Sequence, residues 1–427
     1  MTKVTVVGLG YVGLPLACLC AGKGYKVYGL DIDKKKVDLI NKNQSPIDDE
    51  YIINKLKNIK NKIHATTDAN ECIPSSDIVI VCVPTPIDRD NAPDLTALME
   101  SVSTISKFIK QNVLLVIEST IYPGTIEEIV IPILKKQRFD AYKNDIFVAH
   151  CPERIDPGNK KWAIENLPRV IGGITKEATK KSAEFYRSII EADVLELSSV
   201  KAAEATKIME NTFRDVNIAF VNEMAQSFDK AGIDVIEVIK GASTKPFAFM
   251  PHYPGAGVGG HCISIDPYYL IEKAKQLGFH HKFLLLAREI NNNMPAYTVE
   301  LLENELKKLK KSIKGAKVGV LGLTYKANVD DVRESPAFEI INILKTKGAE
   351  VFIFDQHIKN GSNVKDLDEL LQKSDYIVLV TDHNEFKNMD LNKLKKYKIL
   401  VVIDGRNCLD KEKIKAMGIL YHGIGRS

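Results

Sequence analysis

The sequence predicts an α/β protein with a parallel sheet at each end of the chain and a mainly helical part between the two. Short runs of Val and Ile alternate with helix-length segments in the first half of the chain. The pattern becomes helical from about residue 199 to residue 309, and the alternation returns after residue 314. Apolar runs with helix-length spacers are typical of βαβ units, whose parallel strands are buried on both faces.

The first α/β part contains five runs that we predict as strands. They span residues 4–8, 26–30, 78–83, 114–118 and 146–149. Between them, residues 34–43 and 95–110 have the mixed polar and apolar spacing of surface helices.

The central part begins with residues 200–229, a long predicted helix. This segment is rich in Ala, contains neither Gly nor Pro, and repeats apolar residues at helical spacing. A cluster of Pro and Gly at residues 245–260 interrupts the helical pattern, and a further helix is predicted at residues 267–276.

The second α/β part repeats the strand–helix alternation of the first. Its predicted strands span residues 317–321, 350–354, 376–380 and 400–403, with a helix at 336–347. We therefore expect three domains, at residues 1–198, 199–312 and 313–427.

Composition excludes several classes of protein. Of the 427 residues, 45% are hydrophobic and 27% are charged, and 59 Lys and Arg against 55 Asp and Glu leave a net charge of only +4. A dedicated nucleic-acid or membrane-surface binder concentrates its basic residues in one block, which this sequence lacks. No stretch approaches the roughly 18 consecutive apolar residues of a membrane span.

Cysteine usage and the N-terminus indicate the compartment. The seven cysteines include no C-x-x-C pair, so neither a disulfide framework nor a zinc site is expected, and a reducing, cytoplasmic location is favoured. The apolar N-terminus is interrupted by glycines at positions 8, 10 and 13 and by Pro15. A strand, a turn and a helix account for these glycines better than a secretory signal does.

The segment Gly8-Leu-Gly10-Tyr-Val-Gly13 closes the first predicted strand and opens a helix. In a Rossmann-like site the first glycine makes the turn, the second lets a pyrophosphate approach, and the third allows close helix–strand packing. Asp31 ends the next strand, where a carboxylate accepts ribose hydroxyls and repels a 2′-phosphate. NAD is therefore favoured over NADP, although the lysines at 34–36 are compatible with a 2′-phosphate. The alternative is a glycine-rich turn that binds no cofactor.

Residues 255–260 contain four glycines and lead directly to Cys262. Glycine backbone wraps closely around a ligand, and the start of the following predicted helix favours a thiolate. Asp266 follows one helical turn after Cys262, and a thiol beside a carboxylate suits a covalent thio-intermediate hydrolysed by activated water. A structural cysteine in a glycine turn is the alternative. His261 is interpreted as a packing or loop histidine.

The long predicted helix carries Lys207, Asn211 and Arg214 at positions i, i+4 and i+7. This spacing places the ammonium, the amide and the guanidinium on one face of the helix. The three side chains either line a polar pocket or form an ordinary solvated stripe.

These motifs resemble the UDP-glucose/GDP-mannose dehydrogenase (nucleotide-sugar 6-dehydrogenase) superfamily, and the resemblance runs along almost the whole chain. Further motifs in the same order are Val83-Pro-Thr-Pro86, Glu118-Ser-Thr120, Pro152-Glu-Arg154 with Pro157-Gly158, Arg333-Glu-Ser-Pro336 and Asp404-Gly-Arg406. The resemblance implies two Rossmann-like parallel-sheet domains joined by a long central helix and a small helical domain. It also implies NAD as the cofactor, a UDP-sugar as the substrate, no metal and a homodimer built on the central helix.

By the same resemblance, the sugar C6 alcohol is oxidised to a carboxylate by two NAD⁺, through a thiohemiacetal and then a thioester on Cys262. The catalytic residues it implies are Cys262, Lys207, Asp266, Asn211, Glu153 and Thr120. The residues implied for NAD are Gly8, Gly10, Tyr11, Val12, Gly13, Asp31, Lys36, Pro84, Thr85, Ser119, Thr120 and Arg333. The residues implied for the substrate are Glu153, Arg154, Lys207, Asn211, Arg214, Tyr253, Gly259, Lys326 and Arg406.

Two segments bear on the sugar. Residues 211–219 and 244–254 resemble enzymes that act on UDP-N-acetylhexosamines, with Arg214 as the distinguishing residue. Within that branch residues 245–247 and 266–270 favour UDP-N-acetyl-D-glucosamine. Residues 214–219 are shared with UDP-N-acetyl-D-mannosamine enzymes, so that sugar is the alternative, followed by UDP-glucose. Two other classes are weighed against this one: a nucleotide-sugar sensor without turnover, and a two-electron dehydrogenase of the 6-phosphogluconate type.

Overall fold

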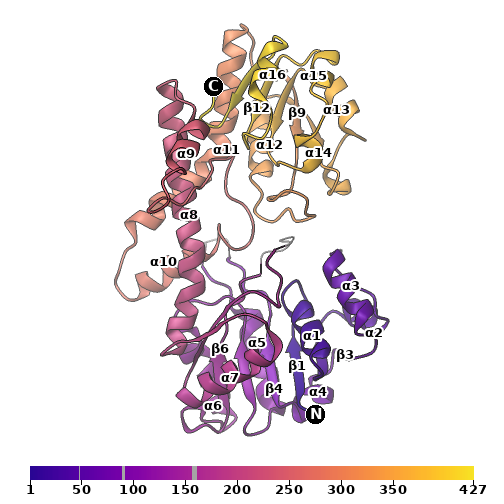
Figure 1. The fold of residues 1–427 in the computed structure, drawn as a ribbon, viewed down its shortest axis with the longest axis vertical. Coiled ribbons are helices and arrows are strands. Elements are labelled where there is room, and N and C mark those ends of the chain that lie inside the picture. The colour runs from indigo at the N-terminus through magenta and orange to yellow at the C-terminus, as the bar shows by residue number, and fades with distance from the viewer. Residues whose placement is uncertain (48, 89–91, 156–160) are drawn as a thin grey trace. The chain divides into compact units, whose positions relative to one another are not determined.

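The apolar runs of the first 200 residues form the strands of one eight-stranded sheet in the computed structural model of the chain (Figure 1). The structure describes residues 1–47, 49–88, 92–155 and 161–427, so Pro157 and Gly158 lie outside the described residues. The described chain divides into two compact units. One consists of Met1–Glu210 and Tyr268–Phe279, and the other consists of Asn211–Pro267 and His280–Ser427.

The sheet of the first unit has the strand order β3-β2-β1-β4-β5-β6-β7-β8. The strands are β1 (Lys3–Val7), β2 (Lys26–Leu30), β3 (Ile63–Thr66), β4 (Ile78–Val81), β5 (Leu114–Ile117), β6 (Phe147–His150), β7 (Arg169–Gly173) and β8 (Val194–Glu196). Every neighbouring pair is parallel except β6 and β7, which are antiparallel. The parallel-rich sheet confirms the predicted fold class, and the antiparallel pair is an exception to it.

Helices connect these strands, and the apolar residues of α1, α2, α3 and α7 pack with the sheet into one core. They are α1 (Gly13–Gly22), α2 (Lys34–Asn41), α3 (Glu50–Asn58), α4 (Ala69–Cys72), α5 (Thr96–Phe108), α6 (Ile131–Lys136) and α7 (Lys176–Ile189). Helix α1 is buried along nearly its whole length because it lies between the sheet and helix α3.

The central helices are α8 (Val200–Lys230), α9 (Val235–Ala242), α10 (Asp266–Gln276) and α11 (Lys282–Lys308). The first of these agrees closely with the predicted helix at residues 200–229, because its Ala-rich sequence has no helix breaker. Within the described ranges, no helix is long and apolar enough to cross a membrane.

The second unit contains a five-stranded, fully parallel sheet with the order β10-β9-β11-β12-β13. Its strands are β9 (Lys317–Leu321), β10 (Glu350–Phe354), β11 (Tyr376–Leu379), β12 (Val401–Asp404) and β13 (Leu420–Gly423). The helices beside it are α12 (Pro336–Thr346), α13 (Leu367–Lys373), α14 (Asn384–Lys387), α15 (Asn392–Lys396) and α16 (Lys411–Ala416).

The two sheets share one local arrangement. A glycine with positive φ follows the first strand of each, Gly8 at +89° and Gly322 at +94°. An aspartate follows the next strand of each and accepts a hydrogen bond from the backbone N–H after that glycine: Asp31 from Leu9 and Asp355 from Leu323. This turn fixes the carboxyl edge of each sheet, where doubly wound folds bind nucleotides.

Candidate functional site

The turn between β1 and α1 has the shape that a bound pyrophosphate requires. A Cβ on Gly13 would lie 1.9 Å from the carbonyl oxygen of Gly8, and a Cβ on Gly8 would lie 2.7 Å from the carbonyl oxygen of Cys82. A Cβ on Gly10 would meet nothing within 4 Å. Two of the three glycines are therefore needed for packing, whereas the middle one faces open space at the start of α1.

Asp31 retains acceptor capacity at the end of β2. Its Oδ2 accepts from the backbone N–H of Leu9 at 2.8 Å, and its Oδ1 accepts from Asp33 N–H at 2.9 Å. Each carboxylate oxygen accepts two hydrogen bonds, so both keep a lone pair for ribose hydroxyls. Lys36 Nζ lies 3.9 Å from Oδ2, which places this predicted cofactor residue beside Asp31. Together with the open face of Gly10, these residues fit NAD.

The ends of β4 and β5 hold the other predicted cofactor residues next to each other. Thr85 donates from Oγ1 to the carbonyl oxygen of Thr120 at 2.7 Å, and Ser119 donates from Oγ to the carbonyl oxygen of Val83 at 2.7 Å. Both strands neighbour β1 or each other in the sheet, so this edge adjoins the glycine turn. Pro84 and Tyr11 are exposed, and Val12 is half-buried.

A buried charge cluster surrounds Glu153, the predicted catalytic and substrate-binding carboxylate. One oxygen of Glu153 accepts from the backbone N–H groups of Arg154 and Ile155, and the other accepts from Arg169 Nη1 at 3.3 Å. Arg169 is 1% exposed and Glu153 is 6% exposed. The backbone N–H groups and the buried Arg169 guanidinium therefore fix the position of the Glu153 carboxylate. A general base needs such a fixed position to reach the proton that it removes.

Glu118 completes this cluster. It is fully buried at the end of β5, and its Oε1 accepts from the hydroxyl of Tyr186. Burial raises the pKa of the Glu118 carboxyl to about 8, even though the Arg169 guanidinium acts in the opposite direction. Two carboxyls thus share one buried guanidinium, and the protonated form of Glu118 balances the charge at neutral pH.

Lys207 and Arg154 differ in how they are held. Lys207 is 8% exposed on α8, and its Nζ has neither a hydrogen-bond nor a salt-bridge partner among the described residues. Arg154 instead forms a salt bridge with Glu210 at 2.7 Å and donates to the carbonyl oxygen of Pro168. An ammonium that is nearly buried and unpaired is available to a ligand anion, whereas the Arg154 guanidinium is already engaged.

The charge of Lys207 also affects His150 at the end of β6. Burial lowers the pKa of His150 to about 3, a hydrogen bond to the carbonyl oxygen of Ile117 opposes this, and Lys207 lowers it further. His150 is therefore neutral at pH 7 and contributes no competing cation near Lys207.

In the second unit, Cys262 and Asp266 stand at the two ends of one turn. The backbone N–H of Asp266 donates to the carbonyl oxygen of Cys262 at 2.8 Å, as in a helical turn. Helix α10 begins at Asp266, close to the predicted start at residue 267, and Cys262 lies on the turn that leads into the helix. Asn211 Nδ2 donates to Asp266 Oδ2 at 2.5 Å, which brings two predicted catalytic residues together.

The glycine-rich segment before Cys262 packs on the loops that follow β9 and β12. The backbone N–H of Gly260 donates to the carbonyl oxygen of Arg333 at 3.0 Å, and Ala256 N–H donates to Gly405 O at 3.0 Å. A Cβ on Gly259 would lie 2.6 Å from the carbonyl oxygen of Glu334. Side chains are excluded from this contact, so glycines are required for the segment to reach the loops.

This packing gathers most of the predicted cations of the second unit around the Cys262 segment. A Cβ on Gly255 would lie 3.0 Å from Arg406 Nη1, and the side chain of Arg406 also donates to the carbonyl oxygen of Val380 at 2.9 Å. Arg333 forms a salt bridge with Asp331 at 2.5 Å, and Lys326 lies on the same loop after β9.

Two predicted substrate residues lie exposed on the surface of the second unit. Arg214 is exposed on α8, and Tyr253 is 59% exposed ahead of the glycine segment. Among the described residues, no group of three or more His, Cys, Asp or Glu is arranged to hold a metal ion.

Sequence reasoning missed Arg169, Tyr186, Asp355 and His383. Arg169 is the first residue of strand β7, and only its salt bridge with Glu153 connects it to the candidate site. His383 follows β11 with no motif around it, and its partner Asp355 lies in the second sheet at the position equivalent to that of Asp31 in the first.

The first unit has a glycine turn and an acidic strand end that fit NAD, and the second has a cysteine turn set among cations. These features define an NAD-dependent dehydrogenase for a nucleotide-linked substrate. Three family models match the chain. They are the NAD binding domain of the UDP-glucose/GDP-mannose dehydrogenase family at residues 2–190, its central domain at 201–293 and its UDP binding domain at 319–411. The chain belongs to the UDP-glucose/GDP-mannose dehydrogenase family and is an NAD-dependent UDP-sugar 6-dehydrogenase.

Full-length relatives carry two substrate names. A UDP-N-acetyl-D-mannosamine dehydrogenase of Methanococcus maripaludis is 40% identical, over 99% of this chain and 97% of its own. A UDP-N-acetyl-D-glucosamine 6-dehydrogenase of Pseudomonas aeruginosa is 37% identical, over 96% of this chain and 98% of its own. The solved structure of the UDP-D-ManNAc dehydrogenase of Pyrococcus horikoshii is 35% identical with a TM-score of 0.93, over 100% of this chain and 99% of that one.

Proposed function

We propose that this enzyme oxidises C6 of UDP-N-acetyl-D-glucosamine to the carboxylate, with Cys262 as the covalent nucleophile. The observation that carries the proposal is the turn from Cys262 to Asp266, whose carboxylate is held by Asn211. A thiol and an oriented carboxylate on one turn supply a nucleophile and a water-activating base. Arg406, a cation for a diphosphate, lies against Gly255 in the segment that leads to this turn.

The reaction consumes one alcohol, two NAD⁺ and one water, and it yields one carboxylate, two NADH and three protons. When bound, NAD⁺ accepts the hydride that leaves C6 in each of the two oxidations. In the first oxidation C6 becomes an aldehyde, and the hydroxyl proton passes to a base. The Cys262 thiolate then bonds to C6 and gives a thiohemiacetal, whose alkoxide the Lys207 ammonium stabilises.

Loss of the second hydride converts the thiohemiacetal to a thioester. Asp266 takes a proton from the attacking water, the C6–S bond breaks, and the thiolate leaves as the carboxylate forms. Asn211 orients Asp266 for this step, and Thr120 and Glu153 position the water and the sugar. A substrate bound through sulfur stays on the enzyme between the two oxidations, so no aldehyde is released.

The remaining predicted residues divide between the two ligands. Arg333 and the residues of the first unit named above contact NAD. Arg154, Arg214, Tyr253, Gly259, Lys326 and Arg406 contact the UDP-sugar. The network around Glu153 supports one part of this assignment, because a carboxylate fixed by Arg169 suits a sugar-binding position.

The glucosamine epimer is preferred because residues 245–247 and 266–270 resemble that branch. The mannosamine epimer is the second candidate, favoured by the name of the 40% identical relative. The two sugars differ only in configuration at C2. Incubating the protein with NAD⁺ and each of UDP-N-acetyl-D-glucosamine, UDP-N-acetyl-D-mannosamine and UDP-glucose distinguishes them by kcat/KM. We expect UDP-N-acetyl-D-glucosamine to be the best substrate, and a higher value for either of the others overturns the assignment.

Stoichiometry and one cysteine variant test the covalent route. Wild-type enzyme should form two NADH per uronic acid. Cys262→Ala should stop formation of the acid, whereas Cys72→Ala, at a buried cysteine at the end of α4, serves as the matched control. One NADH per product, or wild-type acid formation by Cys262→Ala, contradicts the mechanism.

We further propose a cytoplasmic homodimer of three-domain subunits, built on α8. Met209, Phe213 and Phe220 on this helix are exposed by 69%, 46% and 54% of their surfaces, which supports a covered apolar face. Sedimentation of the active enzyme should give the mass of two chains, and an active monomer contradicts the proposal.

A further inference from the structure

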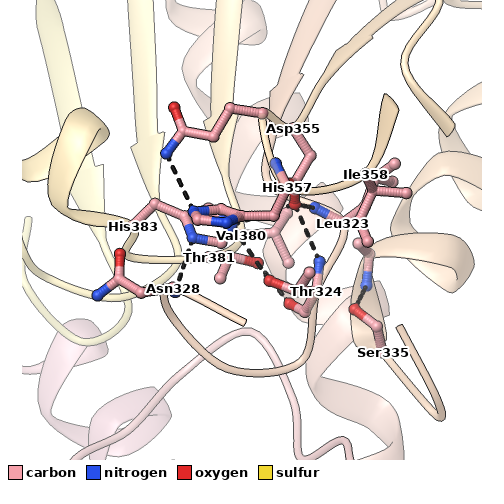
Figure 2. A network of polar contacts seen from close by, with 12 residues as sticks. Leu323, Thr324, Asn328, Ser335, Asp355, His357, Ile358, Val380, Thr381 and His383 are labelled. Carbon is pink, nitrogen blue, oxygen red and sulfur yellow. Dashed lines mark hydrogen bonds and ion pairs between the residues drawn. The ribbon is translucent and has the colours of Figure 1, made fainter. Parts of the chain in front are cut away.

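Hydrogen bonds between side chains and the loop backbone hold the loop that carries Lys326 on both sides of this residue. The loop leaves β9 at Gly322, and side chains from other parts of the second sheet tie it down (Figure 2). Thr324 donates from Oγ1 to the carbonyl oxygen of Lys326 at 2.8 Å, and Arg406 donates from Nη2 to the carbonyl oxygen of Tyr325 at 3.3 Å. Two residues beyond Lys326, the backbone N–H of Asn328 donates to His383 Nδ1 at 2.9 Å.

The contact with Asn328 determines which nitrogen of His383 carries the proton. A backbone N–H is only a donor, so Nδ1 is the unprotonated acceptor and the ring proton lies on Nε2. That proton points to Asp355 Oδ2 at 3.1 Å and to Thr324 Oγ1 at 3.1 Å. His383 is therefore a neutral ring that joins a buried carboxylate on one side to the Lys326 loop on the other.

Asp355 is held firmly enough to orient the ring. Its carboxylate also accepts from the backbone N–H groups of Leu323 at 2.6 Å, Thr324 at 3.2 Å and His357 at 2.8 Å. Burial alone raises the pKa of Asp355, but the hydrogen bonds from His383 and from these N–H groups lower it to about 2. Asp355 is thus a carboxylate throughout the physiological range.

The ring itself has little freedom to move. His383 is fully buried, and the ring of His357 lies 4.6 Å from it at an angle of 30°. Phe386 packs edge-on at 5.4 Å. Asn328 is also tied at its side chain, because its Oδ1 accepts from the backbone N–H of Asn384 at 3.0 Å. Asn328 adopts a positive φ of 60°, a conformation that needs such support.

We propose that His383 is a positioning residue for the UDP-sugar: through the Asn328 N–H it holds the Lys326 loop in the conformation that binds the nucleotide diphosphate. The proposal rests on the role proposed above for Lys326. Lysine binds phosphate as a flexible point charge, so its affinity depends on where the backbone places it. His383 acts only through the loop and touches neither ligand.

Two conservative variants separate this role from simple core packing. In His383→Asn, the amide oxygen occupies the place of Nδ1 and still accepts from Asn328, but contact with Asp355 is lost. In His383→Gln, the amide nitrogen occupies the place of Nε2 and still reaches Asp355, but the bond to the loop is lost. The full-length variants are compared by melting temperature, by KM for UDP-N-acetyl-D-glucosamine and NAD⁺, by kcat, and by calorimetric Kd for UDP.

We expect His383→Gln to raise the KM for the UDP-sugar and the Kd for UDP about tenfold, the loss expected for one buried hydrogen bond. His383→Asn should stay within about twofold of the wild type. The kcat and the KM for NAD⁺ should be unchanged in both. The proposal is overturned if His383→Gln binds UDP like the wild type. It is equally overturned if both variants lose affinity in proportion to their loss of melting temperature.

Lys326→Ala tests the premise separately. Weaker UDP binding by Lys326→Ala supports the assignment of Lys326 to the nucleotide. If Lys326→Ala binds UDP as the wild type does, the proposed role of Lys326 fails, whatever the His383 variants show. If Lys326→Ala weakens UDP binding and His383→Gln does not, the positioning role alone fails and the proposed function stands.

Discussion

Asn211 donates from Nδ2 to Asp266 Oδ2 at 2.5 Å, across 55 positions of the sequence. Asp266 is 2% exposed and Asn211 is 6% exposed. The bond fixes the rotation of a carboxylate that begins α10 one turn after Cys262. A fixed, nearly buried carboxylate directs its remaining lone pairs to one place, which an unheld carboxylate on the surface does not do.

Asp266→Asn should slow turnover about 100-fold or more, because the variant removes the base that activates water. If hydrolysis of the thioester is the impaired step, the Cys262 adduct accumulates, and intact-mass analysis after mixing with UDP-sugar and NAD⁺ detects it. Asn211→Ala keeps the base but frees its rotation, so a smaller loss of kcat is expected. Wild-type kcat for Asp266→Asn contradicts the assignment.

The two glycines at positions 10 and 13 should respond differently to the same methyl group. Gly13→Ala places Cβ against the carbonyl oxygen of Gly8 and should cost about 3 kcal/mol of stability. Gly10→Ala has open space, so its melting temperature should match the wild type while the KM for NAD⁺ rises about tenfold, since the pyrophosphate loses its approach. Unchanged NAD⁺ binding by a stable Gly10→Ala enzyme excludes the turn as the pyrophosphate site.

Glu118→Gln should gain stability relative to the wild type as the pH rises. In the folded protein the Glu118 carboxyl keeps its proton up to a pKa of about 8, whereas in the unfolded chain it loses the proton near 4.5. The wild type therefore loses stability between these two values, and glutamine has no proton to lose. Urea unfolding at pH 5, 6, 7 and 8 measures the difference.

A matched substitution, Glu100→Gln on the exposed face of α5, should show no such trend. A difference between Glu118→Gln and the wild type that stays constant with pH would mean that Glu118 is ionised in the folded enzyme.

Protonated His422 should stabilise the folded protein, whereas ionisation of Glu118 disfavours it. Its two ring nitrogens lie 2.9 Å from Asp229 Oδ1 and from Glu305 Oε1, and it joins β13 to α8 and α11. Burial alone lowers the pKa of His422, but the bonds to Asp229 and Glu305 outweigh it and raise the pKa above its usual value. The stabilisation is fully present below about pH 6.5 and is lost as the pH rises through the raised pKa.

His422→Gln should therefore cost about 2 kcal/mol of unfolding free energy at pH 6 and clearly less at pH 9. Urea unfolding at both pH values measures this. An equal cost at both would show that folding does not raise the pKa of His422.

The sequence predicts nine strands, which correspond to β1, β2, β4, β5, β6, β9, β10, β11 and β12. Most of them are rich in the β-branched, Leu and aromatic residues that a buried parallel strand requires. β3 and β13 contain histidine, β7 begins with arginine and ends in two glycines, and β8 has only three residues. Their strand conformation comes from neighbours in the sheet, which a local pattern does not contain.

The residues of the candidate site likewise divide into those that a local sequence pattern marks and those that it does not. Glycine motifs and Cys262 are visible because their chemistry and spacing lie within a few residues. Arg169 pairs with a carboxylate 16 positions away and His383 with one 28 positions away, so their roles depend on the folded sheet. Which of the predicted residues act in catalysis stays a prediction that the variants above test.

Asp355 occupies in the second sheet the position that Asp31 occupies in the first, yet its carboxylate is more fully engaged within the protein. Its Oδ2 accepts from two backbone N–H groups and the His383 ring, and its Oδ1 accepts from a third backbone N–H, whereas each oxygen of Asp31 accepts from one backbone N–H. Asp355 is 1% exposed and Asp31 is 8% exposed. The same strand-end aspartate is therefore open to a ligand in the first sheet, and in the second it holds a histidine and a loop, so two copies of one turn have different tasks.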